Sequence, residues 1–238
     1  MQERDFWGHL DELRTCILKS LAGLLVGVVI SFAFVSHILK FLSQPYVGHL
    51  ANLKSLSPGD TFSVTVKTAI LTGLGLSFPW IAYQLWGFIS PGLHKHERKY
   101  VVPFCASVAF FFLAGSAFAY FLVLPAVVSF FYEYSIKMGV APDWTISNYL
   151  EFVTTFLVSF GVVFELPVAI ATLTFFGVTN SKWLASYRRH AIVVIFIVAA
   201  IFTPPDFISQ ITMAVPMVIL YEVSILVSKM IEKKNNIL

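Results

Sequence analysis

Six apolar runs divide this chain, and they restrict its possible folds more than any other feature. The runs cover residues 16–36, 66–89, 101–131, 149–177, 190–203 and 207–227. A membrane-spanning helix needs about 20 apolar residues to cross about 30 Å of hydrocarbon, whereas a barrel strand shows only about 10 residues of alternating polarity. Only 12% of the residues are charged. The sequence therefore predicts an all-α integral membrane protein: one polytopic domain over residues 1–238, with six spans.

Basic residues are distributed unequally between the two sides of these spans. If both termini are inside, the inner segments hold 12 of the 16 Lys and Arg residues. Because basic residues stay on the cytoplasmic side, this bias predicts an N-in, C-in topology, which also requires an even number of spans. The first outer loop, residues 37–65, is predicted to be long, and the second, 132–148, ends at a predicted helix cap, Ser147-Asn148.

Spans five and six are the short ones, and the fifth is shorter than a bilayer requires. Its 14 residues, rising about 1.5 Å each, reach only about 21 Å. Prolines at positions 204 and 205 stop this helix. Either the bilayer thins locally beside the span or a partner covers the mismatch.

Two features inside the spans are unusual for helices that contact lipid alone. Glu165 lies near the middle of the fourth span, where an ionisable side chain is costly and is a functional candidate. Pro167 leaves a backbone carbonyl nearby without its helical donor, so the site can be polar and kinked. The alternative is a protonated structural glutamate bonded to a neighbouring helix. Gly23 and Gly27 have the GxxxG spacing of closely packed helices.

Two carboxylates, Glu12 and Glu97, lie beside spans on the predicted inner face. On a helix, the positions three and four residues from each hold no Lys or Arg. A carboxylate binds the planar guanidinium of arginine through two parallel hydrogen bonds, which lysine cannot copy. Both are candidates for binding arginines of another molecule, although a solvated loop charge is the alternative. Arg14 and Arg98 either take part or only set topology.

The sequence offers no pattern for catalysis, metal binding or a cofactor. It contains no HExxH, GxSxG or GxxxxGK[ST] motif, its six histidines form no ligand cluster, and Cys16 and Cys105 lie at or within spans. An enzyme is therefore not expected. A secondary transporter would show repeated broken helices, and no repeated motif is present. A scaffold without a receptor role is a further alternative.

Four separated segments carry a resemblance to a known family. They are HLDELR at 9–14, PWIAYQLWGFISPGLHKHERK at 79–99, FELP at 164–167 and TPPD at 203–206. In this order, and with six N-in spans, the chain resembles TatC, the multispanning core receptor of the twin-arginine protein translocase. The resemblance covers nearly the whole chain. One departure is Cys16, where the family often has a second basic residue.

The resemblance implies a machine for exporting folded proteins across a bacterial cytoplasmic membrane, with both termini cytoplasmic. Such a protein binds signal peptides that carry two arginines ahead of an apolar stretch. It recruits single-span TatA- and TatB-type partners and further TatC copies, and the proton-motive force drives transport. No cofactor and no nucleic acid are implied.

The resemblance also implies roles for particular residues. Signal-peptide binding falls to Glu97, with Glu12, Arg14 and Arg98, and an intramembrane polar site falls to Glu165. The implied partner-helix contacts are Gln210, Thr203 and Asp206, and Pro45 and Tyr120 match family positions on the outer side.

Overall fold

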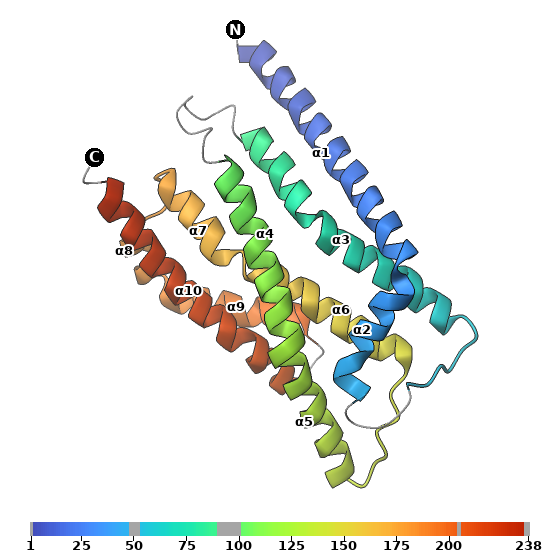
Figure 1. The fold of residues 1–238 in the computed structure, drawn as a ribbon. Helices are drawn as coiled ribbons and strands as arrows, with labels where there is room; N and C mark the ends of the chain where they lie inside the picture. Colours follow the sequence, from blue (N-terminus) through green and yellow to red (C-terminus); the bar gives the residue numbers. More distant parts are fainter. Residues whose placement is uncertain (1, 48–52, 90–100, 204–205, 236–238) are drawn as a thin grey trace.

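The chain folds into a bundle of long helices that run up and down past one another (Figure 1). A computed structural model describes residues 2–47, 53–89, 101–203 and 206–235. The helices are α1 (Gln2–Ala33), α2 (Val35–Val47), α3 (Asp60–Ile89), α4 (Val101–Phe118), the π-helical turn η3 (Ala119–Val123), α5 (Leu124–Lys137), α6 (Ile146–Val163), α7 (Leu166–Phe175), α8 (Ser181–Ser186), α9 (Arg188–Phe202) and α10 (Phe207–Asn235). Both ends of the chain lie at the same end of the bundle, as an even number of crossings requires (Figure 1).

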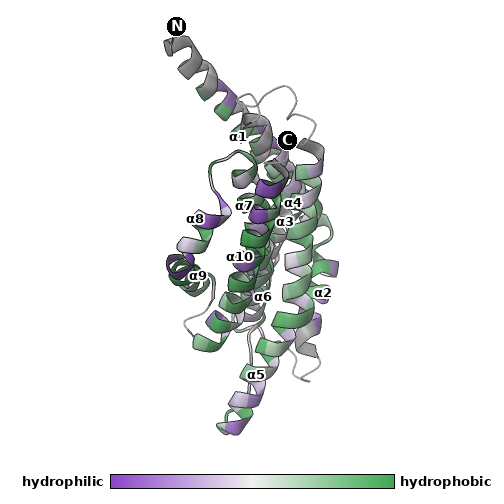
Figure 2. Cartoon of the chain, turned by 90° about the vertical axis from the view of Figure 1, so that its left-hand side faces the viewer, coloured by the Kyte–Doolittle hydropathy of each residue, from purple (hydrophilic) through white to green (hydrophobic). Residues whose placement is uncertain are grey.

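The described residues contain five helical segments that are long and apolar enough to cross a membrane. They are Leu10–Ala33, Asp60–Leu85, Pro103–Lys137, Ile146–Phe175 and Phe207–Lys233. The remaining predicted span lies on α9, which has 15 residues and is therefore about 22 Å long. Hydrophobic residues predominate along most of the helices (Figure 2), and many large apolar side chains are exposed, as expected of helices that face lipid.

Two predicted spans form irregular helices. The third continues through η3, a π-helical turn that interrupts the α-helical pattern, and ends only at Lys137. The fourth is divided into α6 and α7 at Phe164 and Glu165. Pro167 lies in the first turn of α7. Because proline lacks the backbone N–H that would continue the helix from α6, the break falls just before it.

Glycines let α1 and α3 pack at very short range. A Cβ atom at Gly23 would collide with the ring of Trp80, and one at Gly27 would lie only 2.7 Å from the carbonyl oxygen of Gly73. The close approach allows Ser77 Oγ to donate a hydrogen bond to the Gly23 carbonyl oxygen at 3.0 Å. The close packing predicted from the GxxxG spacing is therefore confirmed.

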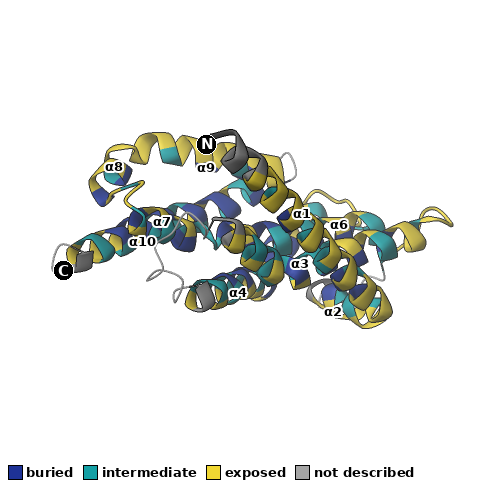
Figure 3. Cartoon of the chain, turned by 90° about the horizontal axis from the view of Figure 1, so that it is seen from above, coloured by how far each residue is buried: buried dark blue, intermediate teal, exposed yellow. Residues whose placement is uncertain are grey.

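The buried core is built around α6, which runs through the middle of the bundle (Figure 1). Phe156 and Phe160 of α6 are fully buried, together with Leu124 of α5 and Met213 of α10. Exposed side chains concentrate on the outward faces, and α9 is exposed along most of its length (Figure 3). The side chains of α9 therefore form one flank of the bundle.

Two tyrosine hydroxyls fasten α2 to the bundle, within the segment predicted as the first outer loop. Tyr120 of η3 donates a hydrogen bond to the Phe41 carbonyl oxygen at 2.7 Å, and Tyr149 of α6 donates one to the Leu42 carbonyl oxygen at 3.2 Å. Phe41 lies four residues before Pro45, which has no backbone N–H to donate to the Phe41 carbonyl. The Tyr120 hydroxyl thus replaces a helical donor that α2 lacks, and the Tyr149 hydroxyl adds a second contact to the α2 backbone.

The loops at the end opposite the termini are joined to one another. Lys54 donates its backbone N–H to the Trp144 carbonyl oxygen at 3.1 Å, and its ammonium group pairs with Asp143 at 2.6 Å. Nearby, Lys67 of α3 pairs with Glu151 of α6 at 2.7 Å. These contacts hold the segment before α3 against the segment before α6.

The helix cap of α6 differs from the predicted one. Thr145 is the N-cap, and its side chain accepts a hydrogen bond from the Asn148 backbone N–H at 3.3 Å. The backbone of Thr145 is extended, as an N-cap requires, and Ser147 and Asn148 already lie in the first turn. The prediction of a cap at Ser147-Asn148 was therefore wrong.

Candidate functional site

The first candidate region is the end of the bundle that carries both termini. Glu12 and Arg14 lie on α1, and the side chains of both are exposed. The antiparallel register of α1 against α3 is fixed by Trp80, whose Nε1 donates to the Lys19 carbonyl oxygen at 3.1 Å. Glu12 lies two helical turns beyond Lys19, about 10 Å closer to the N-terminus.

Glu97 and Arg98 lie outside the described residues. The chain that contains them joins the C-terminal end of α3 to the N-terminal end of α4. Both of those helix ends lie at the end of the bundle toward which α1 points its N-terminus (Figure 1). The fold therefore brings the two anchor points of this connection to the same membrane face as Glu12.

Glu165 occupies the break between α6 and α7. Its Oε1 atom is buried and has no hydrogen-bond partner among the described residues, and the carboxyl group lies against the backbone of Phe112 on α4. Close packing surrounds the break, because a Cβ atom at Gly115 of α4 would lie 2.7 Å from the ring of Phe164. A carboxyl oxygen held in this way is suited to a hydrogen-bond donor from another molecule.

Three of the predicted residues lie between the end of α9 and the first turn of α10, and their polar groups form hydrogen bonds within the chain. Thr203 Oγ1 donates to the Ala199 carbonyl oxygen at 2.9 Å, Asp206 Oδ1 accepts from the Ser209 N–H at 2.7 Å, and Gln210 Nε2 donates to the Phe196 carbonyl oxygen at 3.0 Å. These bonds shape the turn. The outward face of α9 is apolar, with Ile197 and Ile201 exposed by 56% and 73%.

The two predicted residues on the opposite side of the bundle lie on α2 and η3. Pro45 lies within α2. Tyr120 is buried, its ring stacks on Phe41 with 4.3 Å between centroids, and its hydroxyl binds the α2 backbone. The observed contacts of Tyr120 are thus those of an anchor for α2.

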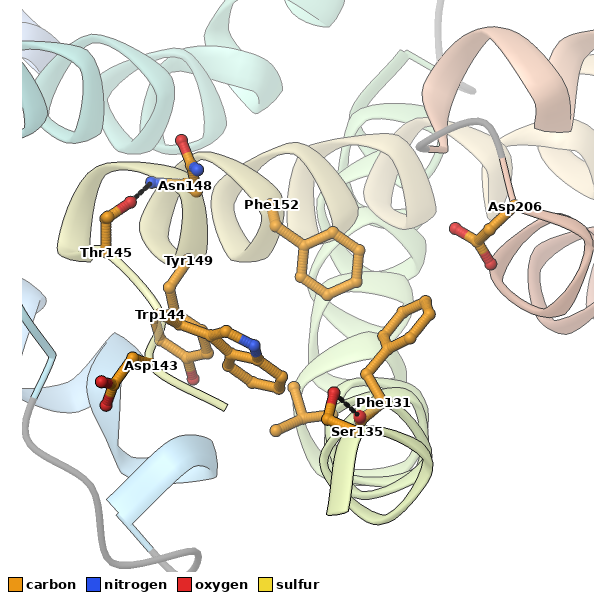
Figure 4. Close-up of a pocket in the computed structure, with 10 residues that line it drawn as sticks. Phe131, Ser135, Asp143, Trp144, Thr145, Asn148, Tyr149, Phe152 and Asp206 are labelled. Carbon is orange, nitrogen blue, oxygen red and sulfur yellow. Dashed lines mark hydrogen bonds between the residues drawn. The ribbon is translucent and has the colours of Figure 1, made fainter. Parts of the chain in front are cut away.

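Sequence reasoning missed a cavity of about 540 Å³ at the end opposite the termini (Figure 4). Its lining residues are Val128, Phe131, Ser135, Asp143, Trp144, Thr145, Asn148, Tyr149, Phe152 and Asp206. The sequence carries a partial signal for it, since Trp144, Tyr149 and Phe152 gather around one helix start. Asp206 lies more than fifty residues further along the chain, so its place in the cavity wall could not be predicted from the sequence.

The sequence analysis also did not predict two polar contacts that join α8 and α9 to α10. Arg188 at the start of α9 pairs with Glu222 of α10 at 2.8 Å. Glu232 near the end of α10 accepts hydrogen bonds from the backbone N–H and the hydroxyl of Ser181 at the start of α8, at 2.5 Å and 2.6 Å. Within the described ranges, no group of His, Cys, Asp and Glu side chains could hold a metal ion.

Comparison with known proteins settles the family. Residues 8–216 match the family model described as Sec-independent protein translocase protein (TatC). The chain belongs to the TatC family. TatC relatives from Halothiobacillus neapolitanus and Carboxydothermus hydrogenoformans are 42% and 37% identical to it over 96% and 95% of its length. The alignments span 63% of the Halothiobacillus protein and 93% of the Carboxydothermus protein.

The TatC fold is shared with a solved structure. A crystal structure of the "Twin Arginine Translocase Receptor- TatC" superimposes with a TM-score of 0.86 at 33% identity, covering 94% of this chain and 99% of that one. The predicted all-α, multispanning TatC fold is therefore confirmed. The chain is a multi-pass membrane protein and a core TatC subunit of the twin-arginine translocase, and by its family it is not an enzyme.

Proposed function

We propose that this TatC subunit binds signal peptides carrying paired arginines at the membrane face that holds its two termini. The observation that carries this proposal is the antiparallel pairing of α1 with α3. That pairing, held by the Trp80–Lys19 hydrogen bond, brings Glu12 to the same face as the ends of α3 and α4 that the connection containing Glu97 joins. In this proposal Glu97 binds one guanidinium group of the signal, and Glu12 supports it.

The energetics require several contacts to act together. An exposed ion pair contributes only about 0–1 kcal/mol, so one carboxylate alone cannot select a signal. Bidentate pairing distinguishes arginine from lysine, and packing of the apolar part of the signal against the bundle supplies further affinity. Arg14 and Arg98 flank the carboxylates in the sequence and orient them in this proposal.

Partner binding is proposed for the flank formed by α9 and the start of α10. α9 is about 22 Å long and exposes apolar side chains, so a single-span helix of the TatA or TatB type can pack beside it and relieve the mismatch with the bilayer. Thr203, Asp206 and Gln210 shape the end of this flank through their internal hydrogen bonds. Glu165 is proposed to accept a hydrogen bond from a polar group of the partner or of the passing substrate.

The proposed setting is a bacterial cytoplasmic membrane with both termini cytoplasmic. There the subunit assembles with further TatC copies and with its single-span partners, and transport of folded precursors uses the proton-motive force. The excess of Lys and Arg in the segments on the side of the termini supports this orientation.

Peptide titration of the purified protein tests the receptor role. A labelled peptide with two arginines ahead of an apolar stretch is compared with its twin-lysine version, for the wild type and for Glu97→Gln. We expect the wild type to bind the arginine peptide tightly and the lysine peptide weakly, and Glu97→Gln to bind both weakly. Glu133→Gln, which removes an exposed carboxylate at the opposite end of the bundle, is the matched control and should bind like the wild type. Equal binding of both peptides, unchanged by Glu97→Gln, would refute the proposal.

A further inference from the structure

The cavity at the end opposite the termini has walls from three parts of the chain. α5 contributes Phe131 and Ser135, the start of α6 contributes Tyr149 and Phe152, and the residue just before α10, Asp206, closes the far side (Figure 4). Its volume of about 540 Å³ is within the range of small-molecule sites. Because it lies at the end of the bundle, it falls at the level of a membrane surface.

Aromatic rings form much of the cavity wall. Trp144 and Tyr149 stack with 6.5 Å between ring centroids and an interplanar angle of 15°, and Phe131 and Phe152 face the same space (Figure 4). Ring faces attract cations, and aromatic cages of this kind recognise substituted ammonium groups. Trp and Tyr are also the residues that favour the headgroup level of a bilayer.

The charged residues of the cavity are acidic. Among the described residues that line it there is no Lys, Arg or His, whereas Asp143 and Asp206 both contribute. Asp143 is already paired with Lys54 at 2.6 Å. Asp206 uses Oδ1 to cap α10 through the Ser209 N–H, and its Oδ2 is buried with no hydrogen-bond partner in the described part of the chain. The group that complements this site is a cation that carries N–H donors.

We propose that the cavity binds the primary ammonium headgroup of a phosphatidylethanolamine lipid from the leaflet opposite the termini. The ammonium group sits against the aromatic rings and donates a hydrogen bond to Asp206. A choline headgroup has no N–H to donate, and a glycerol headgroup has no cation, so both fit less well. Phe207, which follows Asp206 in the chain, and Ile211, one helical turn further along α10, are exposed by 68% and 46%, and in this proposal the acyl chains pack on them.

The proposal is independent of signal-peptide binding, and lipid titration without peptide tests it. Purified, delipidated protein is titrated with phosphatidylethanolamine, phosphatidylcholine and phosphatidylglycerol of identical acyl chains, and bound lipid is counted by native mass spectrometry. We expect phosphatidylethanolamine to bind about tenfold more tightly than phosphatidylcholine, the factor expected for one charge-assisted hydrogen bond. Equal binding of these two lipids would overturn the proposal, as would a preference for the anionic lipid.

Asp206→Asn is the decisive variant, because asparagine is also a good N-cap residue, whereas the substitution removes the charge and replaces one acceptor oxygen by an NH2 donor. This variant should lose the ethanolamine preference, whereas Glu133→Gln, which removes an exposed carboxylate of α5 that does not line the cavity, should keep it. If Asp206→Asn does not fold, Phe152→Leu removes an aromatic face of the cavity and should reduce the same preference. A preference that persists in the folded variants would overturn the proposal.

Discussion

Replacing Gly27 by alanine should loosen the pairing of α1 with α3, although it adds only one methyl group. The new Cβ atom would lie 2.7 Å from the Gly73 carbonyl oxygen and in collision with Ser77 Oγ. The serine side chain can rotate away, but the carbonyl belongs to the α3 backbone, so the helices must separate. Overpacking of this kind costs about 1–3 kcal/mol.

Separation of the helices would also lengthen or break the hydrogen bond from Ser77 Oγ to the Gly23 carbonyl oxygen, which contributes about 1 kcal/mol. Gly87→Ala is the matched control, since a Cβ atom at that helical position meets nothing within 4 Å. Both variants share the helix-propensity gain of about 1 kcal/mol. The difference between their free energies of unfolding therefore measures the cost of the collision at Gly27. Gly27→Ala should therefore be less stable than Gly87→Ala by about 2–4 kcal/mol.

Reversible unfolding in mixed micelles of a mild detergent and sodium dodecyl sulfate measures this difference. Gly27→Ala combined with Ser77→Ala should recover only part of the loss, because the Gly73 carbonyl oxygen remains in place. The same Gly27→Ala protein should also bind the twin-arginine peptide more weakly, since the helix pair positions Glu12. Equal stabilities for Gly27→Ala and Gly87→Ala would refute the argument that the backbone contact limits this interface.

Two further predictions concern side chains that join elements distant in sequence. Tyr120→Phe keeps the ring stack on α2 but removes the hydroxyl bond to its backbone, so unfolding in the same micelles should show a loss of about 1 kcal/mol; an unchanged stability would mean that this bond does not help to hold α2. Glu232→Gln removes the charge that two donors of Ser181 share, and limited proteolysis between α7 and α8 should become about tenfold faster, a result that an unaltered cleavage rate would contradict.

The spans and their main irregularity follow from local sequence. Long apolar runs dictate helices in lipid because no other backbone hydrogen-bonding scheme is available to a single segment there. Pro167 predicts the break beside Glu165, since the missing N–H acts within one turn. The close approach at Gly23 and Gly27 follows from residue size alone.

Other features depend on contacts that a local pattern does not contain. α2 lies in a predicted loop, and its anchors Tyr120 and Tyr149 are 79 and 107 residues from the carbonyls they bind. The π-helical turn uses the same residue types as an α-helix, so its apolar sequence does not distinguish them. Thr145 and Asn148 are both suitable cap residues, and only the backbone conformation selects between them.

The α1–α3 pair has a consequence for how the protein is made. Ser77 follows Gly23 by 54 residues in the chain, so at usual synthesis rates α1 waits about 3–11 s in the membrane before its partner emerges. At the glycines, α1 exposes only backbone to lipid, and the backbone N–H and C=O groups there are already hydrogen-bonded within the helix. Ser77 likewise arrives with an acceptor of its own, the Gly73 carbonyl oxygen at 2.7 Å. Each helix can therefore enter the bilayer alone, because the backbone at Gly23 and Gly27 and the Ser77 hydroxyl are already hydrogen-bonded before α1 and α3 pair.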